Sequence, residues 1–508
     1  MFRSIVSKID KDKDYPARTS TIDVYTRVLE GALYDHLKFG FHQEKNDDNG
    51  DYVPLRDRRP TVRYNICRLV VDDSVSLLFS EGHFPTAETD DEKLKEALKD
   101  LMKDANLNEL MLDAATRGSV GSVAILMRIL KQDDGKHKVF LKNFRTTFLT
   151  PTFSKANPNK LTKISEQYKV KGETLKELGY AIKDDTLKHD YWFRREWDEN
   201  SEIWFMPWPV VQDHDQEAKP GVIDPARTVE HKLGFVPWVW IRNLPGDLKL
   251  IEGVGTPVFS PIDGACTFAA AIDQMIEIDY QLSQAGRGLK YSMDPTLLIK
   301  EPAAPGQGMV KSADMAIVVS EKGDAKLLEL TGEGFAVVLE YVRALRELGL
   351  ETVHGNRANA DKISAAQSGR AMELLNQALI WLADRLRVSY GEGALLSLLK
   401  MILAANEKYP LDVMGKPWAS IRMTDNNPIS LRWPRWYQPT SHDRQEQATT
   451  LKTHKDAGHL SRETAVKSMA ADYDIEDVPT ELTKIAADIE LEAEMELASQ
   501  VSETIAKK

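Results

Sequence analysis

The sequence predicts an α+β protein, and three patterns along the chain lead to this class. Apolar residues recur at helical spacing within the first 118 residues, as at Val24, Val28 and Leu29. Runs rich in aromatic and β-branched residues, separated by turn residues, then occupy 138 to 242. From Pro261 onward the pattern is again mainly helical. A chain of 508 residues is long enough for two or more domains.

Composition and charge narrow the functional classes. Apolar residues make up 42% of the chain and charged residues 28%, as in ordinary globular proteins. The formal net charge of −12 argues against a protein that clamps DNA through a basic surface, but it is compatible with a surface that DNA slides past. Cys67 and Cys266 are too few for a disulfide framework and indicate buried thiols in a reducing compartment.

No targeting or membrane segment is expected. The first twenty residues contain no apolar core of signal-peptide length. Charged residues interrupt each apolar run before it reaches the roughly 18 residues of a membrane span. The nearest approach is the run beginning at Gly264, which Asp273, Glu277 and Asp279 break. We therefore expect a soluble protein that has no membrane partner.

The N-terminal part of the chain predicts three helices and a buried strand. Helical spacing covers residues 20 to 40, 63 to 82 with Gly82 as the C-terminal cap, and 91 to 118. The small residues GSVGS at 118 to 122 then predict a turn that leads into the apolar strand VAILMRIL.

Residues 138 to 242 predict a mostly antiparallel β region. The strand sequences are KVFLKNF, KISEQYKV, YWFRREW, EIWFMPW and FVPWVWI. Tryptophans lie within these strand runs, so we expect them to pack in the core rather than stack on nucleic-acid bases. They are Trp204, Trp208, Trp238 and Trp240.

The following region predicts two helices around a less regular insertion. Residues 262 to 284 carry an apolar stripe, with an acidic face opposite to it. Residues 286 to 330 contain short strand sequences among Gly and Pro. Residues 335 to 353 again have helical spacing.

The last part of the chain predicts one very long helix and a polar helical end. Residues 368 to 409 have helical spacing, with a kink expected at Gly391 and Gly393. A strand and further helices follow. Residues 471 to 508 hold eleven acidic residues against three lysines, which predicts an exposed acidic helix.

Sequence signatures of catalysis are lacking. The chain contains no P-loop, no H-E-x-x-H, no C-x-x-C pair, no G-x-S-x-G elbow and no dinucleotide fingerprint. DHDQE offers Asp213, His214 and Asp215 as metal ligands, although a solvated turn between Pro209 and Pro220 explains it more simply. We expect no enzyme activity, no catalytic residues, no cofactor and no bound metal.

The stretch HGNRANADKISAAQSGRAMEL, residues 354 to 374, separates two strong helical patterns. It contains few large apolar residues and many small or amide residues. From composition alone it is either an ordinary surface connection between helices or a functional loop.

Six segments, in this order, resemble sequences of the portal protein family of tailed bacteriophages. The resemblance extends from about residue 20 to 495, with Asp263 at a characteristic position and Gly264 in place of the family's Asn. The segments are YNICRLVVDDSVSLLFSEG, RGSVGSVAILMRI, LGFVPWVWIRNLPG, GVGTPVFSPIDGACTFAAAIDQMIE, SAAQSGRAMELLNQAL and AGHLSRETAVKSM.

The resemblance implies a portal fold that assembles as a ring, usually of twelve copies, at one capsid vertex. It also implies a division into named regions. These are the wing (1–255), first stem helix (256–287), clip (288–332), second stem helix (333–354), tunnel loop (355–367), long wing helix (368–409), wing return strand (410–436) and crown (437–508).

The resemblance assigns residues 355 to 367, within the stretch between the two helical patterns, to a tunnel loop that faces DNA. Gly355 and the small alanines suit a loop that must bend in a narrow channel. Its polar and charged residues would touch phosphates without gripping them, because Asp361 offsets part of the positive charge. The implied channel residues are Asn356, Arg357, Asn359, Asp361, Lys362, Ser364 and Gln367.

The implied function is DNA packaging and ejection through the portal of a virion that is assembled in the host cytoplasm. The implied partners are further copies of the chain, double-stranded DNA, terminase, the major capsid protein and a head-completion or adaptor protein. Two alternatives stay open from the residues themselves. One is a different virion structural protein, and the other is a metal-dependent hydrolase that uses DHDQE.

Overall fold

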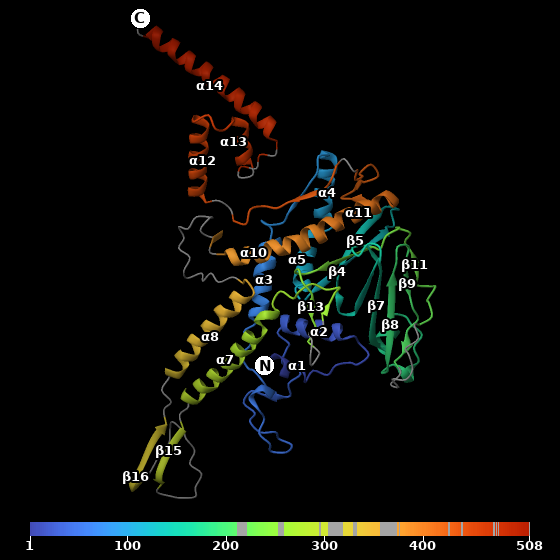
Figure 1. Cartoon of the computed structure of the whole chain (residues 1–508), viewed down its shortest axis with the longest axis vertical. Coiled ribbons are helices and arrows are strands. Elements are labelled where there is room, and N and C mark those ends of the chain that lie inside the picture. Colours follow the sequence, from blue (N-terminus) through green and yellow to red (C-terminus); the bar gives the residue numbers. More distant parts are fainter. Residues whose placement is uncertain are drawn as a thin grey trace. The chain divides into compact units, whose positions relative to one another are not determined.

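The computed structural model of the chain describes residues 1–210, 221–251, 259–293, 296–302, 319–328, 333–355, 373–374, 376–424, 427–437, 440–470, 473, 475 and 477–506. The chain divides into two compact units. The larger unit holds 1–357 and 378–434, and the smaller holds 358–377 and 435–508. Helices and sheets are both extensive (Figure 1), so the predicted α+β class is confirmed.

Helix α2 spans Ala17–Leu29 and is shorter than the helix predicted over 20 to 40. Gly31 takes φ +75°, and its N–H donates to the Val28 carbonyl at 3.1 Å. The N–H of Ala32 donates to the Arg27 carbonyl at 2.8 Å. This pair of bonds is a Schellman motif, which satisfies the last carbonyls and ends the helix.

The other two predicted N-terminal helices also form, with changed ends. Helix α3 spans Ile66–Phe79, and its N-terminal cap is Asn65, whose side chain accepts the N–H of Arg68. Its C-terminal cap is Ser80, not Gly82. The helix predicted over 91 to 118 divides in two because Asn106 is left-handed, with φ +46°. Its parts are α4 (Glu92–Asp104) and α5 (Leu107–Gly118).

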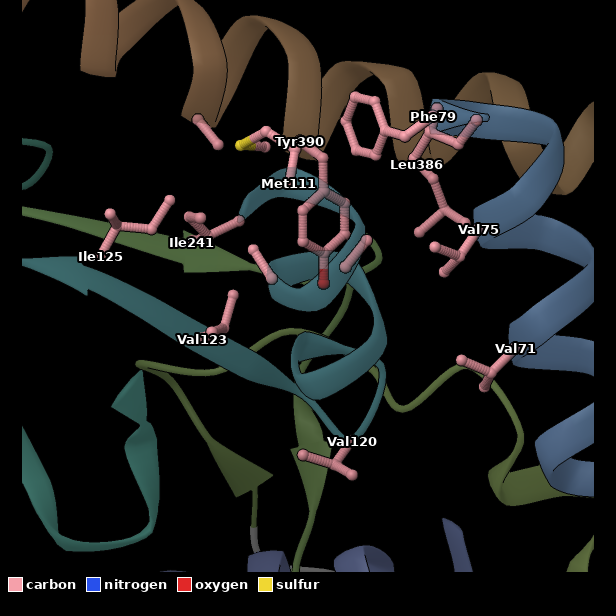
Figure 2. Packing of buried hydrophobic residues seen from close by; sticks show 14 of the residues in the cluster. Val71, Val75, Phe79, Met111, Val120, Val123, Ile125, Ile241, Leu386 and Tyr390 are labelled. Carbon is pink, nitrogen blue, oxygen red and sulfur yellow. The ribbon is translucent and has the colours of Figure 1, made fainter. Parts of the chain in front are cut away.

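A small antiparallel sheet lies at the centre of the larger unit's core. Strand β4 (Ser122–Lys131) pairs with β5 (His137–Arg145) on one side and β12 (Trp238–Arg242) on the other. The first six residues of β4 are buried, as its apolar sequence predicts. Figure 2 shows Val123, Ile125 and Ile241 of this sheet facing side chains of the helices.

A second antiparallel sheet packs beside the first one. Its described strands run in the order β11-β9-β8-β7-β6, and β10 pairs with β8. Trp197 and Trp238 meet at 4.9 Å between ring centroids and join the two sheets, which confirms core packing for Trp238. The strands are β6 (Leu149–Phe153), β7 (Leu161–Lys171), β8 (Asp190–Trp197), β9 (Ser201–Trp204), β10 (Trp208–Pro209) and β11 (Val229–Glu230).

Two long helices and a β-hairpin follow the sheets. Helix α7 (Ile272–Met293) packs along α8 (Glu333–Thr352), and the hairpin lies beyond their far ends (Figure 1). Its strands β15 (Thr296–Pro302) and β16 (Val319–Leu328) are antiparallel. The predicted helix, strands and helix are thus present, although α7 begins ten residues after the predicted position 262.

The long helix is continuous over Gln377–Lys408 but not regular. It consists of α10 (Gln377–Leu386), a π-helical segment (Arg387–Leu395) and α11 (Leu396–Lys408). By length and composition alone this helix is apolar enough to cross a membrane. However, 56% of its most apolar 18-residue stretch is buried, and the buried side chains form part of the core of the larger unit.

Shorter elements complete the larger unit. Strand β19 (Ser430–Arg432) follows the long helix, as predicted, and pairs with β3 (Thr86–Glu88). The remaining described α-helices and strands are α1 (Phe2–Val6), α6 (Gly172–Glu177), β1 (Phe39–Gly40), β2 (Arg58–Arg59), β13 (Leu248–Lys249), β14 (Phe259–Ser260), β17 (Asp412–Val413) and β18 (Lys416–Pro417). Short 3-10 helices cover Leu55–Asp57, Thr146–Phe148, Asp184–Thr186 and Ala269–Ala271.

The smaller unit is helical in its described part. It contains α12 (Ser441–Asp456), α13 (Arg462–Met469) and α14 (Val478–Ala506). Thr440 and Asp443 form a capping box at the start of α12, and Ser461 caps α13. Helix α14 is the acidic C-terminal helix that the sequence predicts.

Candidate functional site

The residues predicted to line a DNA channel lie outside the described part of the chain. Asn356, Arg357, Asn359, Asp361, Lys362, Ser364 and Gln367 all fall within 356–372. The segments on both sides are described, with α8, His354 and Gly355 before the gap and α10 after it. The candidate site is therefore built from these segments and from α7.

Helix α8 ends in a Schellman motif that has histidine in the left-handed position. His354 takes φ +57°, a conformation that histidine adopts more readily than most residues. The N–H of Gly355 donates to the Leu350 carbonyl at 2.8 Å, and that of His354 to the Glu351 carbonyl at 3.4 Å. The chain therefore turns out of the helix at a fixed point.

Gly355 is buried and closely packed, which corrects the expectation that it gives a loop freedom to bend. Its φ is not in the left-handed region. A Cβ atom at this position would lie 2.8 Å from Leu350 Cδ2 and 3.0 Å from Val70 Cγ2 of α3. The glycine is required because the chain passes directly against α3.

The described segments on either side of 356–372 meet at an aromatic contact. The rings of His354 and Trp381 lie edge to face, with centroids 6.5 Å apart. Trp381 belongs to α10 and is more than half exposed. The chain thus leaves α8 and enters the long helix at nearly the same place.

The base of α8 is held tightly against two other helices. A Cβ atom on Gly349 would lie 2.9 Å from Ile66 Cδ1 of α3 and 3.5 Å from Gln274 Cβ of α7. Arg346 of α8 donates from Nε to the Tyr64 hydroxyl at 3.0 Å. This end of the helical pair is therefore part of the core of the larger unit.

Helix α8 carries an exposed apolar stripe along one side. Val337, Tyr341 and Leu348 are 66%, 47% and 56% exposed, and their spacing places them along one side of the helix. The half-buried Val342 and Leu345 lie on a different side and pack against the core. The described part of the chain leaves the stripe uncovered, which is unusual for contiguous apolar side chains on an isolated protein.

Asp279 of α7 is buried, so the predicted acidic face of this helix does not include it. Its carboxylate accepts hydrogen bonds from the Tyr34 hydroxyl at 2.8 Å and the Tyr64 backbone N–H at 2.6 Å. Burial raises the pKa of Asp279 to about 6, and these two hydrogen bonds offset part of the rise. Asp279 thereby joins α7 to the segments that follow α2 and precede α3.

Asp263, a residue of the portal resemblance, accepts four hydrogen bonds just before α7. Arg18 of α2 donates Nε at 2.5 Å and Nη2 at 2.7 Å to its two oxygens. The hydroxyl groups of Ser122 and Ser260 also donate to it. The carboxylate is fully buried, and these donors compensate its charge.

The backbone after Asp263 explains why α7 begins late. The N–H of Gly264 donates to the Gly121 carbonyl at 2.9 Å, and that of Ala265 to the Leu244 carbonyl at 3.0 Å. Together with the bond from the Thr267 N–H to the Ser119 carbonyl at 2.9 Å, these bonds tie residues 264 to 267 to neighbouring segments, and α7 begins after them at Ile272. A Cβ atom on Gly264 would lie 2.6 Å from the Leu244 oxygen, which accounts for glycine at this position.

A second buried network joins the π-helical segment to the central sheet. Asn243 donates from Nδ2 to Thr267 Oγ1 at 2.8 Å and accepts the Tyr390 hydroxyl at 3.0 Å. Tyr390 points into the core beside Met111 and Ile241 (Figure 2). Its hydroxyl fills the space above Gly118, where a Cβ atom would lie only 2.1 Å away.

The family resemblance marked Asp263, but sequence reasoning did not single out Asn243, Arg18 or Tyr390. Arg18 lies on a short helix among many charged residues, and no local pattern distinguishes it. Tyr390 follows ordinary helical spacing. Gly118 was the one indication in the sequence that another group packs closely here, because a glycine next to a buried strand often marks such a close approach.

The proposed metal ligands of DHDQE, Asp213, His214 and Asp215, also lie outside the described residues. Within the described ranges, no three His, Cys, Asp or Glu side chains gather closely enough to hold a metal ion. Both cysteines are free, with Cys67 buried and Cys266 half-buried.

Comparisons with known proteins give similar solved structures but no matching sequence. No protein-family model matches the chain, and no curated protein matches it. One similar chain is from the virion of a native gene transfer agent particle, with TM-score 0.33, 12% identity, and 80% of this chain and 88% of that chain covered. Another is from the neck of a native gene transfer agent particle, with TM-score 0.32, 11% identity, and 79% and 88% covered.

Proposed function

We propose that this chain is the portal protein of a tailed phage or phage-like particle. Its copies form a ring of about twelve at one vertex of the capsid, and double-stranded DNA passes through the ring during packaging and ejection. The ring also provides the platform for head assembly, terminase docking and tail attachment.

The observation that carries this proposal is the path of the chain from α7 to α10. Two long packed helices carry a β-hairpin at their far end, and α8 returns to the core at Gly349. The chain then departs at Gly355 and re-enters at α10, with His354 against Trp381. This order is the one that the family resemblance implies: stem, clip, stem, tunnel loop and long wing helix.

The exposed stripe on α8 supports assembly into a ring. Val337, Tyr341 and Leu348 would be covered if a neighbouring copy packed along this side of the helix. Closed cyclic assemblies use head-to-tail contacts, in which one surface of a copy meets a different surface of the next.

In this proposal residues 356–367 face the DNA. Arg357 and Lys362 provide positive charge and Asp361 removes part of it, so each copy attracts phosphate weakly. Weak attraction repeated around a ring keeps the barrier to sliding low. The hairpin β15–β16 lies in the implied clip, which in this proposal meets the adaptor protein. We assign no catalytic role, cofactor or metal to the chain.

The test is the mass of the purified protein by light scattering, together with negative-stain images. We expect a closed ring with a central hole and a mass close to twelve times the 57.3 kDa of one chain. Leu348→Asp places a charge in the stripe and should reduce the ring to smaller species. Ala336→Asp adds the same charge to α8 outside the stripe and should leave the ring intact.

Other outcomes separate the alternatives. An open polymer or elongated bundle without a hole would indicate a different virion structural protein. A monomer that also fails to enter heads formed with its major capsid protein contradicts the portal assignment. A monomer with chelator-sensitive hydrolysis that Asp213→Ala abolishes would identify the metal-dependent hydrolase.

A further inference from the structure

A groove runs between α13 and α14 in the smaller unit. It has a volume of about 670 Å³, within the range of ligand and peptide sites. Its apolar lining comes from both helices and from the connection between them. The lining residues are Val466, Met469, Tyr473, Ile475 and Ile485, together with the polar Asp477, Thr480, Glu481 and Lys484.

The groove continues as an exposed apolar stripe along α14. Leu491 and Met495 follow the groove residue Lys484 at seven and eleven positions, so all three lie on the same side of the helix. Leu491 is 59% exposed and Met495 is 66% exposed. The groove, Leu491 and Met495 lie along one side of α14, with Lys484 and Asp488 on the same side, and a helix lying along α14 could contact all of them.

The α14 side of this surface is acidic. Asp477 and Glu481 line the groove, and Asp488 lies between Lys484 and Leu491 on the same side of α14. Among the residues that line the groove, Lys484 carries the positive charge, and its Nζ lies 3.5 Å from the Glu481 carboxylate. An occupant with basic residues beside its apolar face would therefore complement the charge.

Neither the α8 stripe nor α14 of another copy fits that description. The exposed apolar stripe on α8 lies among Glu340, Glu347 and Glu351, and α14 is itself acidic. Either helix would place carboxylates against carboxylates in the groove, which is unfavourable. Charge complementarity thus favours an occupant helix with basic rather than acidic residues beside its apolar face.

We infer that the groove between α13 and α14, with the stripe at Leu491 and Met495, binds a basic amphipathic helix of a partner protein. Apolar side chains of that helix enter the groove and cover the stripe, while its lysines or arginines meet Asp477, Glu481 and Asp488. This inference does not depend on the ring, because the whole surface belongs to one copy.

The probe is a fluorescent peptide of about 18 residues, long enough to form a helix, with leucines on one face and lysines beside them. Its binding to the full-length protein is measured by fluorescence anisotropy. We expect saturable binding, and binding at least about tenfold weaker for a matched peptide in which every lysine is glutamate.

Two variants separate groove binding from general attraction to an acidic protein. Leu491→Glu adds a negative charge on the stripe, and Thr483→Glu adds the same charge on another side of α14. Docking predicts at least about tenfold weaker binding for Leu491→Glu and unchanged or tighter binding for Thr483→Glu. Equal binding by both variants, or no binding to the unmodified protein, overturns the inference. A failed ring test leaves this result unaffected.

Discussion

Replacing Asp279 with asparagine should change the pH dependence of stability. The Asp279 side chain is buried in α7 and accepts hydrogen bonds from Tyr34 and the Tyr64 backbone. Asparagine has nearly the same shape, and its Oδ1 can still accept the Tyr64 N–H. The substitution removes the charge that burial makes unfavourable, while it keeps the packing.

The magnitude follows from the pKa of Asp279. Burial raises it from the ordinary 3.8 to about 6 in the folded protein. Because the folded pKa exceeds the unfolded one, the stability due to this group is complete below about pH 4 and is lost as pH rises through 6. A shift of about two units corresponds to about 3 kcal/mol.

The assay is chemical unfolding followed by tryptophan fluorescence, at pH values from 4.5 to 7.5. Between pH 4.5 and 7.5 the Asp279→Asn variant should gain about 2 kcal/mol of stability relative to the unmodified protein, because about 1 kcal/mol of the total effect falls below pH 4.5, and the gain should level off above about pH 6. Asp273→Asn is the matched control, since it removes an exposed charge from the same helix. A difference between Asp279→Asn and the unmodified protein that stays constant over this pH range would refute the reasoning.

Two further predictions concern the long helix. Gly391→Ala should destabilise the larger unit by about 1–3 kcal/mol, because the new Cβ would lie 2.4 Å from Trp433 Cζ2. Gly393→Ala, on the exposed side, should cost nothing measurable in the same thermal unfolding assay. Tyr390→Phe should cost about 1–3 kcal/mol, because it leaves the buried Asn243 Oδ1 without the Tyr390 donor. Tyr52→Phe is the control, because Tyr52 is exposed. Equal unfolding midpoints for the Tyr390→Phe and Tyr52→Phe variants would contradict a stabilising hydrogen bond between Tyr390 and Asn243.

Patterns in the sequence determined the class and order of elements, because these depend on short-range periodicity. Runs rich in aromatic and β-branched residues identified the strands between 138 and 242, and helical spacing identified α3, α8 and the long helix. Element ends were less predictable. The spacing through Leu33 and Leu37 indicated a longer helix, but both residues reach the core from the loop after Gly31.

Only the tertiary structure decided the roles of several residues that the sequence marked. Gly355 looked like a flexible loop residue, yet it is fixed against Leu350 and Val70. Asp279 looked like part of an exposed acidic face, yet it is buried beside Tyr34. These outcomes depend on contacts between segments far apart in the chain, which no local pattern encodes. Composition and spacing indicate which interactions a residue can make, and tertiary packing determines which partners it contacts.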